Sequence, residues 1–344
     1  MRTFTPSPSR RALLALTALV LAFAAPRRGA AQEPESAARP TSAAPAVQVP
    51  FLYELQGHGA TAYLLGTVHL PDPRVLKLPE VVERAFAAAD AVYTEIPATP
   101  AAELQIFGAS RLPKEESLAS IIGEPLMKRL HARLAGARLP VGLFDSFRPW
   151  AVASTLPLLD ILADISTTEP LDKALYNRAV KEGKRVGALE TVAEQIAVFD
   201  GLEQSEQVTM LREAIDQLER YEAQERNALE ELIQAWLSGD LARLVALLEE
   251  GLGADEALAQ KLEQRLVWSR NALMAARMHD AIVAKPTEVL FFAVGALHLP
   301  DARKTEDTSE EEQLRMRGLL SLLRERGYVV THRRALEGAP LSTR

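Results

Sequence analysis

The chain has no cysteine among its 344 residues. This absence excludes disulfides, thiol nucleophiles, thiolate metal ligands and a lipid-modified cysteine. The folded chain must therefore be stabilised by an ordinary hydrophobic core. The roughly 295 residues that follow the N-terminal region are enough to build one, as a large domain or as a domain with a sizeable insertion.

Stripes of basic residues are also missing. The net charge is −7, and both signs of charge are interspersed along the chain. Because nucleic-acid binding needs clustered Lys and Arg, we expect no nucleic acid among the partners. Beyond the N-terminus, no apolar run reaches the ~20 residues that a membrane span requires. We therefore expect no stable membrane insertion of the mature protein.

The longest apolar run, "ALLALTALVLAFAA" at 12–25, lies at the N-terminus. It follows Arg2, Arg10 and Arg11 and precedes the small residues of "RGAAQ", a pattern typical of a secretory signal peptide over residues 1–31. An uncleaved anchor is the alternative. Residues 32–50 are rich in Pro, Ala and Ser, which predicts a flexible linker. The expected location of the protein is the periplasm or the extracellular medium.

From residue 51 to about residue 335 the sequence is typical of a globular domain. A hairpin pattern opens it, short apolar runs alternate with helical patterns at both ends, and residues from about 194 to 284 have helical, polar-faced periodicity. This arrangement predicts an α/β fold. We expect a mixed, largely parallel central sheet with flanking helices and a large helical insertion or cap.

One short motif occurs twice. "AYLLGTVHLPD" at 62–72 and "VLFFAVGALHLPD" at 289–301 are apolar runs that end in Gly-x-x-His-Leu-Pro-Asp. Two more short runs end in an acid, "AVYTE" at Glu95 and "RVGALE" at Glu190. Continuous apolar runs suit buried strands of a parallel sheet, whose ligands bind beyond the carboxyl ends of the strands. If the four strands are neighbours, His69, Glu95, Glu190 and His298 converge at one edge.

Residues around these strand ends have structural interpretations. Gly66 and Gly295 are expected to provide backbone angles that other residues avoid, so that the strand turns and aims the imidazole inward. Asp72 and Asp301 are interpreted as turn or cap residues. Asp172 is interpreted as a residue of a helix N-terminus, where the helix dipole favours an acid.

Two imidazoles and two carboxylates without sulfur suit a divalent metal such as Zn, Mn, Fe or Co. Metal coordination acidifies a water molecule, and a spare carboxylate can serve as general base. The residues thus point to hydrolysis of a polar bond. Metal-free acid–base chemistry by the same residues is an alternative, and so is a purely structural role for the histidines.

The paired Gly-x-x-His motifs, together with "YTE" at 93–95 and "GALETVAEQ" at 187–195, resemble the TraB/GumN family, which includes the TIKI metalloproteases. Further segments that resemble family positions are "EPLDKALYNRAVKEGKRV" at 169–186, "RPW" at 148–150, "RN" at 270–271 and "AVGALHL" at 293–299. The likeness covers residues 51–332, which is nearly the whole chain after the predicted linker.

The resemblance implies an α/β fold in which the two motif halves meet at one site, and a protease that depends on manganese or cobalt. Carried over residue by residue, it makes His69, Glu95, Glu190 and His298 the metal and catalytic set. It places Arg270 and Asn271 beside them, where they would stabilise a developing oxyanion. A surface ion pair is the alternative interpretation of Arg270.

The leading hypothesis is an exported metal-dependent hydrolase, specifically a peptidase, that acts on a peptide or another small polar substrate. His69 and His298 would bind a divalent metal (Mn, Co or Zn), with Glu95 or Glu190 as a further ligand and the other as base. A second hypothesis is a non-catalytic protein that sequesters a peptide or small ligand beneath a helical lid. A third is a module that carries a metal or haem. The sequence holds no signal for the substrate or the oligomeric state.

Overall fold

A computed structural model describes residues 47–159, 169–250, 254–302 and 309–334 of the chain. The predicted signal peptide and most of the predicted linker lie outside these residues. The last four linker residues are described, and they contact the folded domain: Val47 is buried, and the N–H group of Gln48 donates to the carbonyl of Leu237 at 2.9 Å. Within the described ranges, no helix combines the length and the apolar character needed to cross a membrane.

The described residues form one six-stranded sheet, in the order β4–β3–β5–β2–β1–β6. Its strands are β1 (Leu52–Gly57), β2 (Ala60–Thr67), β3 (Ala91–Thr94), β4 (Arg185–Ala188), β5 (Leu290–Gly295) and β6 (Val329–His332). Strands β2, β5, β3 and β4 are parallel to one another, whereas β1 is antiparallel to both of its neighbours. The predicted α/β class and the mixed, largely parallel sheet are therefore confirmed.

The apolar sequence of β5 explains its central position. All six of its residues are buried, because β2 and β3 cover its two edges and helices cover its faces. On one face, the Phe291 ring packs edge-on against Phe86 of helix α1, with ring centroids 5.5 Å apart. A run of apolar residues without alternation is what burial on both faces requires.

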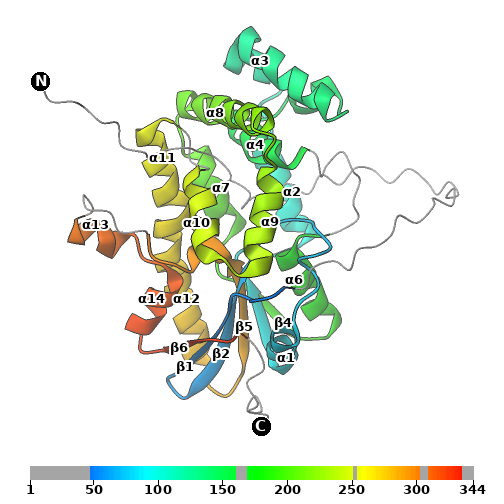
Figure 1. Cartoon of the computed structure of the whole chain (residues 1–344). Helices are drawn as coiled ribbons and strands as arrows, with labels where there is room; N and C mark the ends of the chain where they lie inside the picture. The colour runs from blue at the N-terminus through cyan, green and yellow to red at the C-terminus, as the bar shows by residue number, and fades with distance from the viewer. Residues whose placement is uncertain (1–46, 160–168, 251–253, 303–308, 335–344) are drawn as a thin grey trace, which may run out of the picture.

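Helices surround the sheet (Figure 1). Those that flank it are α1 (Glu80–Ala88), α6 (Leu171–Lys181), α12 (Ser269–Ala284) and α14 (Leu319–Glu325). The other described α-helices are α2 (Pro100–Ser110), α3 (Leu118–Gly136), α4 (Pro149–Thr155), α7 (Val192–Asp200), α8 (Gln204–Ala223), α9 (Ala228–Ser238), α10 (Leu241–Glu250), α11 (Glu256–Glu263) and α13 (Glu310–Arg315). Short 3-10 turns cover Val141–Phe144, Leu156–Leu158 and Ala296–His298, and a π-helix covers Gln264–Trp268.

A helical layer lies beyond the carboxyl ends of the parallel strands, with α3, α4 and α8 farthest from the β1–β2 turn (Figure 1). The helices expected at about 194–284 are α7 to α12. The layer also contains α2, α3 and α4, which come from the connection between β3 and β4. The two segments share one hydrophobic cluster, in which Trp150 of α4 stacks on Phe199 of α7 with centroids 5.4 Å apart. The layer is therefore built from two connections rather than one insertion.

Candidate functional site

The four polar residues predicted at strand ends follow four adjacent parallel strands. Glu95 comes directly after β3, His69 and Glu190 come two residues after β2 and β4, and His298 closes the 3-10 turn after β5. Because the strand order is β4–β3–β5–β2, their order along the edge is Glu190, Glu95, His298, His69. The structure brings all four together.

The carboxylate of Glu95 lies at the centre of the site. Its Oε1 atom is 3.4 Å from Nε2 of His69 and 3.7 Å from Nε2 of His298. The same oxygen accepts a hydrogen bond of 2.7 Å from the backbone N–H of Gly295. The side chain of Glu95 is only 4% exposed. The two Gly-x-x-His motifs thus meet at one buried carboxylate oxygen.

Arg270 occupies the opposite side of Glu95. Its Nη2 group donates to Oε2 of Glu95 at 2.5 Å and to Oε2 of Glu190 at 2.6 Å, while its Nε group donates to Oε1 of Glu190 at 2.9 Å. Its Nη1 group donates to the carbonyl of Leu266, in the π-helix that leads into α12. Gln195 of α7 adds a hydrogen bond of 2.9 Å to Oε2 of Glu95. Arg270 is therefore a buried partner of two carboxylates and not part of a surface ion pair.

A polar partner orients each imidazole through its Nδ1 atom. Nδ1 of His69 lies 2.9 Å from Oδ1 of Asp172, and Nδ1 of His298 lies 2.6 Å from Oδ1 of Asn271. The amide nitrogen of Asn271 donates to the carbonyl of Arg317, which fixes the orientation of the amide. Oδ1 of Asn271 therefore accepts a hydrogen bond from the Nδ1–H group of His298, and Nε2 of His298 keeps its lone pair.

The surroundings give the two histidines opposite pKa shifts. Burial, and after it the Arg270 guanidinium, lower the pKa of His298 to about 3, so this imidazole is neutral. Burial acts in the same direction on His69, but the carboxylates of Asp172 and Glu95 outweigh it and raise its pKa well above the ordinary value. For Glu95, burial favours a higher pKa, but Arg270 and the two histidines hold the pKa well below its usual range.

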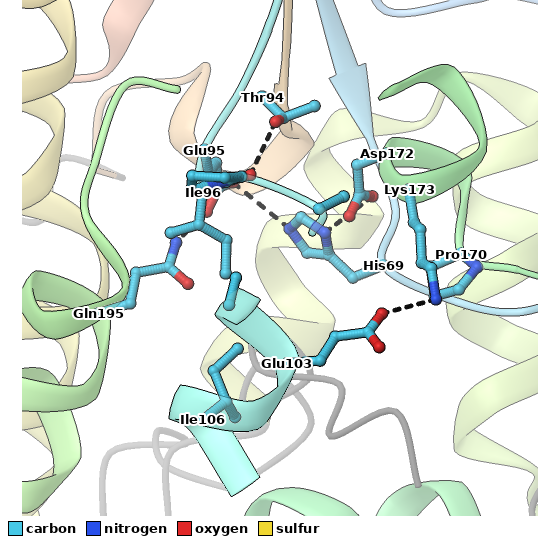
Figure 2. A pocket seen from close by; sticks show the side chains of 13 residues that line it. His69, Thr94, Glu95, Ile96, Glu103, Ile106, Pro170, Asp172, Lys173 and Gln195 are labelled. Atoms are coloured by element: carbon cyan, nitrogen blue, oxygen red, sulfur yellow. Dashed lines mark hydrogen bonds and ion pairs between the residues drawn. The ribbon is translucent and has the colours of Figure 1, made fainter. Parts of the chain in front are cut away.

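A cavity of about 100 Å³ opens beside His69 and Glu95 (Figure 2). Across it, Nζ of Lys173 on α6 forms an ion pair of 2.7 Å with Oε1 of Glu103 on α2. Its lining consists of His69, Thr94, Glu95, Ile96, Pro97, Ala98, Ala102, Glu103, Ile106, Pro170, Asp172, Lys173 and Gln195. Glu190 lines a neighbouring hollow with Arg277. One of the two motif histidines, His69, therefore lines an open cavity.

The predicted reason for the motif glycines is wrong. Neither Gly66 nor Gly295 has a positive φ, and Gly295 has a φ of −50° and a ψ of 132°. Space is the actual reason. A Cβ atom on Gly295 would lie 2.9 Å from Nε2 of His69 and 3.2 Å from Oε1 of Glu95. A Cβ atom on Gly66 would lie 2.6 Å from Cδ1 of Leu299. The glycines are needed because other groups fill the position of a side chain.

Two residues at the site had no predicted role in it. Asp172 does lie in the first turn of α6, as predicted, but its carboxylate also contacts His69. Gln195 hydrogen-bonds both Glu95 and Glu190. Both residues belong to segments that resemble the TraB/GumN family, at 169–186 and 187–195. That resemblance was the only sequence signal that could have placed them at the site. Asp301, predicted as a turn or cap residue, accepts a hydrogen bond of 2.8 Å from the N–H of Gly318, the residue that precedes α14.

The sequence profile of the TraB/PrgY/gumN family matches residues 51–332. The chain belongs to this family. It is similar to metalloprotease TIKI2 of Danio rerio, with 27% identity over 314 aligned residues that cover 79% of this chain and 58% of the relative. It is also similar to metalloprotease TIKI1 of Xenopus tropicalis, with 26% identity over 69% of this chain and 55% of the relative. Metalloprotease TIKI1 of Homo sapiens is 25% identical over 81% of this chain and 61% of its own length.

The chain thus spans between 55% and 61% of the length of these three TraB/PrgY/gumN relatives. No solved structure matches it.

The names of these relatives imply a divalent metal in the family. Nε2 of His69, Nε2 of His298 and Oε1 of Glu95 are nitrogen and oxygen donors of the types that such a metal accepts. In a tetrahedral site with bonds of about 2.1 Å, ligand atoms lie about 3.4 Å apart, close to the 3.4 and 3.7 Å separations here. Among the described residues, no group of three or more His, Asp or Glu side chains is arranged so that it could hold a metal ion. The three donors match a metal by type and by these two separations, but they do not form a complete set of ligands.

Proposed function

We propose that this TraB/PrgY/gumN protein is an exported, metal-dependent peptidase. The observation that carries the proposal is the approach of two imidazole Nε2 atoms to one carboxylate oxygen, that of Glu95, beside an open cavity. Relatives named metalloproteases support the reaction class. The signal-peptide pattern at residues 1–31 supports export to the periplasm or the medium.

In this proposal, His69, His298 and Glu95 hold a divalent metal (Mn, Co or Zn). When bound, such a metal acidifies water and polarises the peptide carbonyl. Asp172 and Asn271 act behind the ligands, because each holds an imidazole by Nδ1 and leaves Nε2 directed at Glu95. Carboxylate and amide partners of this kind fix the orientation of ligating histidines and raise their basicity.

The two glutamates have different roles in the proposal. Both oxygens of Glu190 accept hydrogen bonds from Arg270, whereas Oε1 of Glu95 faces the two histidines. Glu95 is thus the better ligand. Glu190 holds Arg270 in place, and Arg270 in turn keeps Glu95 ionised. Because the Nε and Nη2 groups of Arg270 donate to carboxylates and Nη1 donates to the carbonyl of Leu266, Arg270 acts on the site through Glu95 and not as an oxyanion donor.

Hydrolysis of a peptide library tests the proposal. The purified mature protein is assayed with Mn, Co or Zn and again with a chelator, in parallel with the His69→Ala and His298→Ala variants. We expect cleavage that needs the metal and falls at least a hundredfold in both variants, on the order of the loss that removing a catalytic group causes. His131→Ala, at a 39%-exposed side chain on α3, is the matched control and should retain activity. Equal rates in all four proteins would exclude a peptidase at this site.

A binding protein without turnover is the second candidate. Two observations favour it: Arg270 pairs with both glutamates, and no group of three or more His, Asp or Glu side chains in the described part of the chain is arranged so that it could hold a metal ion. The same cavity would then hold a peptide or small ligand beneath the helical layer. Recovery of the bound ligand chemically intact, with binding that survives a chelator, would favour this candidate over the peptidase.

A further inference from the structure

We propose that the cavity beside His69 is a specificity subsite for an aliphatic side chain, carried by the substrate residue next to the cleaved bond. The inference rests on the proposed peptidase function and names a substrate class for it. The cavity adjoins the reacting groups directly, because His69 and Glu95 are part of its lining. A substrate whose peptide group lies at these residues therefore has a neighbouring side chain within reach of the cavity.

One wall of the cavity is apolar. Ala102 and Ile106 of α2 line the cavity, and both are less than 8% exposed. Ile96, in the connection from β3, lines it as well, and Figure 2 shows Ile96 and Ile106. Pro97 and Pro170 continue this lining. Each square ångström of apolar surface buried here contributes about 25 cal/mol, so an aliphatic group gains affinity by entering.

The charges at the other wall are already paired. Lys173 lies 2.7 Å from Glu103 and 3.6 Å from Glu169, and Asp172 lies 2.9 Å from the ring of His69. A charged substrate side chain entering the cavity would lose its water and meet charged groups that already form ion pairs with one another. Because burial of an unpaired charge is costly, the cavity selects against charged side chains.

The volume of the cavity limits the size of the substrate side chain that it can hold. An apolar protein cavity of about 150 Å³ holds benzene. At about 100 Å³, this cavity suits Val or Leu better than Phe. Ala102 sets the limit on the α2 side, because a longer side chain at this position would project into the space.

The test uses the metal-loaded mature protein and peptides that are identical except for one residue, which is Ala, Val, Leu, Phe, Asp or Lys. Mass spectrometry locates the cleaved bond. We expect kcat/KM for Val and Leu to exceed that for Asp and Lys by at least roughly tenfold, since one methylene in such a pocket changes it by 10–200-fold. Ala102→Leu should reverse the preference for Leu over Ala. Ile106→Ala should shift the preference towards Phe.

Leu104→Ala is the matched control, because Leu104 is on the same helix and 72% exposed. It should leave the ratio of kcat/KM for Leu and Ala peptides unchanged. An unchanged ratio in both Ala102→Leu and Ile106→Ala would overturn the subsite, with the peptidase function intact.

Binding of N-acetyl-leucinamide separates the two possible failures. We expect nuclear magnetic resonance titration to show tighter binding of this probe than of the aspartic acid analogue, and weaker binding to Ala102→Leu. If no peptide is cleaved and this order holds, the proposed function fails and the subsite stands. If the two probes bind equally, or if Ala102→Leu binds both as the wild type does, the subsite is wrong.

Discussion

Oδ1 of Asn271 lies 2.6 Å from Nδ1 of His298, and both side chains are buried. The amide nitrogen of Asn271 donates to the carbonyl of Arg317, which fixes the orientation of the amide. Oδ1 can therefore accept only from the tautomer of His298 that carries its hydrogen on Nδ1. A buried ring that loses its acceptor keeps a polar N–H without a partner, which costs about 1–3 kcal/mol.

We therefore expect Asn271→Leu to lower the free energy of unfolding by about 1–3 kcal/mol, and to reduce peptide hydrolysis because His298 is no longer oriented. Urea denaturation measures the first effect. Asn177→Leu is the matched control, because Asn177 is exposed on α6 and should change stability by less than about 0.5 kcal/mol. Equal stability losses in the two variants would contradict the role assigned to Asn271.

Replacement of Arg270 should have the largest effect on stability. Arg270→Met leaves the carboxylates of Glu95 and Glu190 buried without their cation, which costs about 3–5 kcal/mol. Arg270→Lys should recover little of this, because an ammonium group cannot reproduce the forked hydrogen bonds to two carboxylates. The measurement is urea denaturation at neutral pH. As the control, Arg277→Met removes a 35%-exposed arginine paired with Glu194 and should cost less than about 1 kcal/mol.

The stability of the protein should depend on pH through His298. Burial and Arg270 lower its folded pKa to about 3, from an ordinary value of 6.5. Between these values the unfolded chain binds a proton that the native protein does not, so the free energy of unfolding decreases as the pH falls from 6.5 towards 3. The slope from this residue approaches about 1.4 kcal/mol per pH unit near pH 5.

Two neighbours act in other parts of the pH range. The stabilisation from Glu95, whose pKa is held low, is present above about pH 4.5 and is lost as the pH falls through its folded pKa. His69 has a raised pKa in the folded protein. The stabilisation that it contributes is present below about pH 6.5 and is lost as the pH rises through its folded pKa.

Urea denaturation of chelator-treated protein between pH 6.5 and 5 isolates the contribution of His298. We expect a steeper loss of stability in the wild type than in His298→Gln, with His131→Gln as the matched substitution on α3. Parallel pH dependences of wild type and His298→Gln would show that His298 is not held neutral in the fold.

Gly295→Ala should damage the site more than the fold. The added methyl group would lie 2.9 Å from Nε2 of His69 and 3.2 Å from Oε1 of Glu95, so these side chains must move apart. We expect hydrolysis to fall by at least about tenfold, since small displacements of reacting groups are costly. Gly108→Ala on α2 meets no atom within 4 Å and should instead stabilise the protein by about 0.5–1 kcal/mol. Unaltered hydrolysis by Gly295→Ala would contradict the conclusion that a Cβ atom at this position displaces His69 and Glu95.

The sequence alone was sufficient to predict that the polar residues at four strand ends lie together. Apolar runs that stop at His69, Glu95, Glu190 and His298 indicate parallel strands, and parallel strands place their carboxyl ends on one edge. This inference needs no knowledge of helix packing. The strand order then made the four residues neighbours, and the paired motifs identified the family independently.

Partners contributed by helices could not be predicted in the same way. The local sequence explains each residue without reference to the site. Asp172 is an acidic residue in the first turn of α6, and Gln195 is part of the amphipathic helix α7. Their contacts with His69 and Glu95 depend on how α6 and α7 dock on the sheet, which no short sequence pattern encodes. The predicted reason for Gly66 and Gly295 was wrong for the same cause. Groups that are distant in sequence approach these glycines closely, and the local sequence does not encode that approach.

The position of β5 has a consequence for protein synthesis. This strand is inserted between β2 and β3, although it is translated long after both. A nascent chain that ends before residue 290 lacks the strand that joins the two halves of the sheet, and with it the second histidine. Truncated or stalled products therefore cannot bring His298 to Glu95, and the four polar strand-end residues meet only when translation is nearly complete.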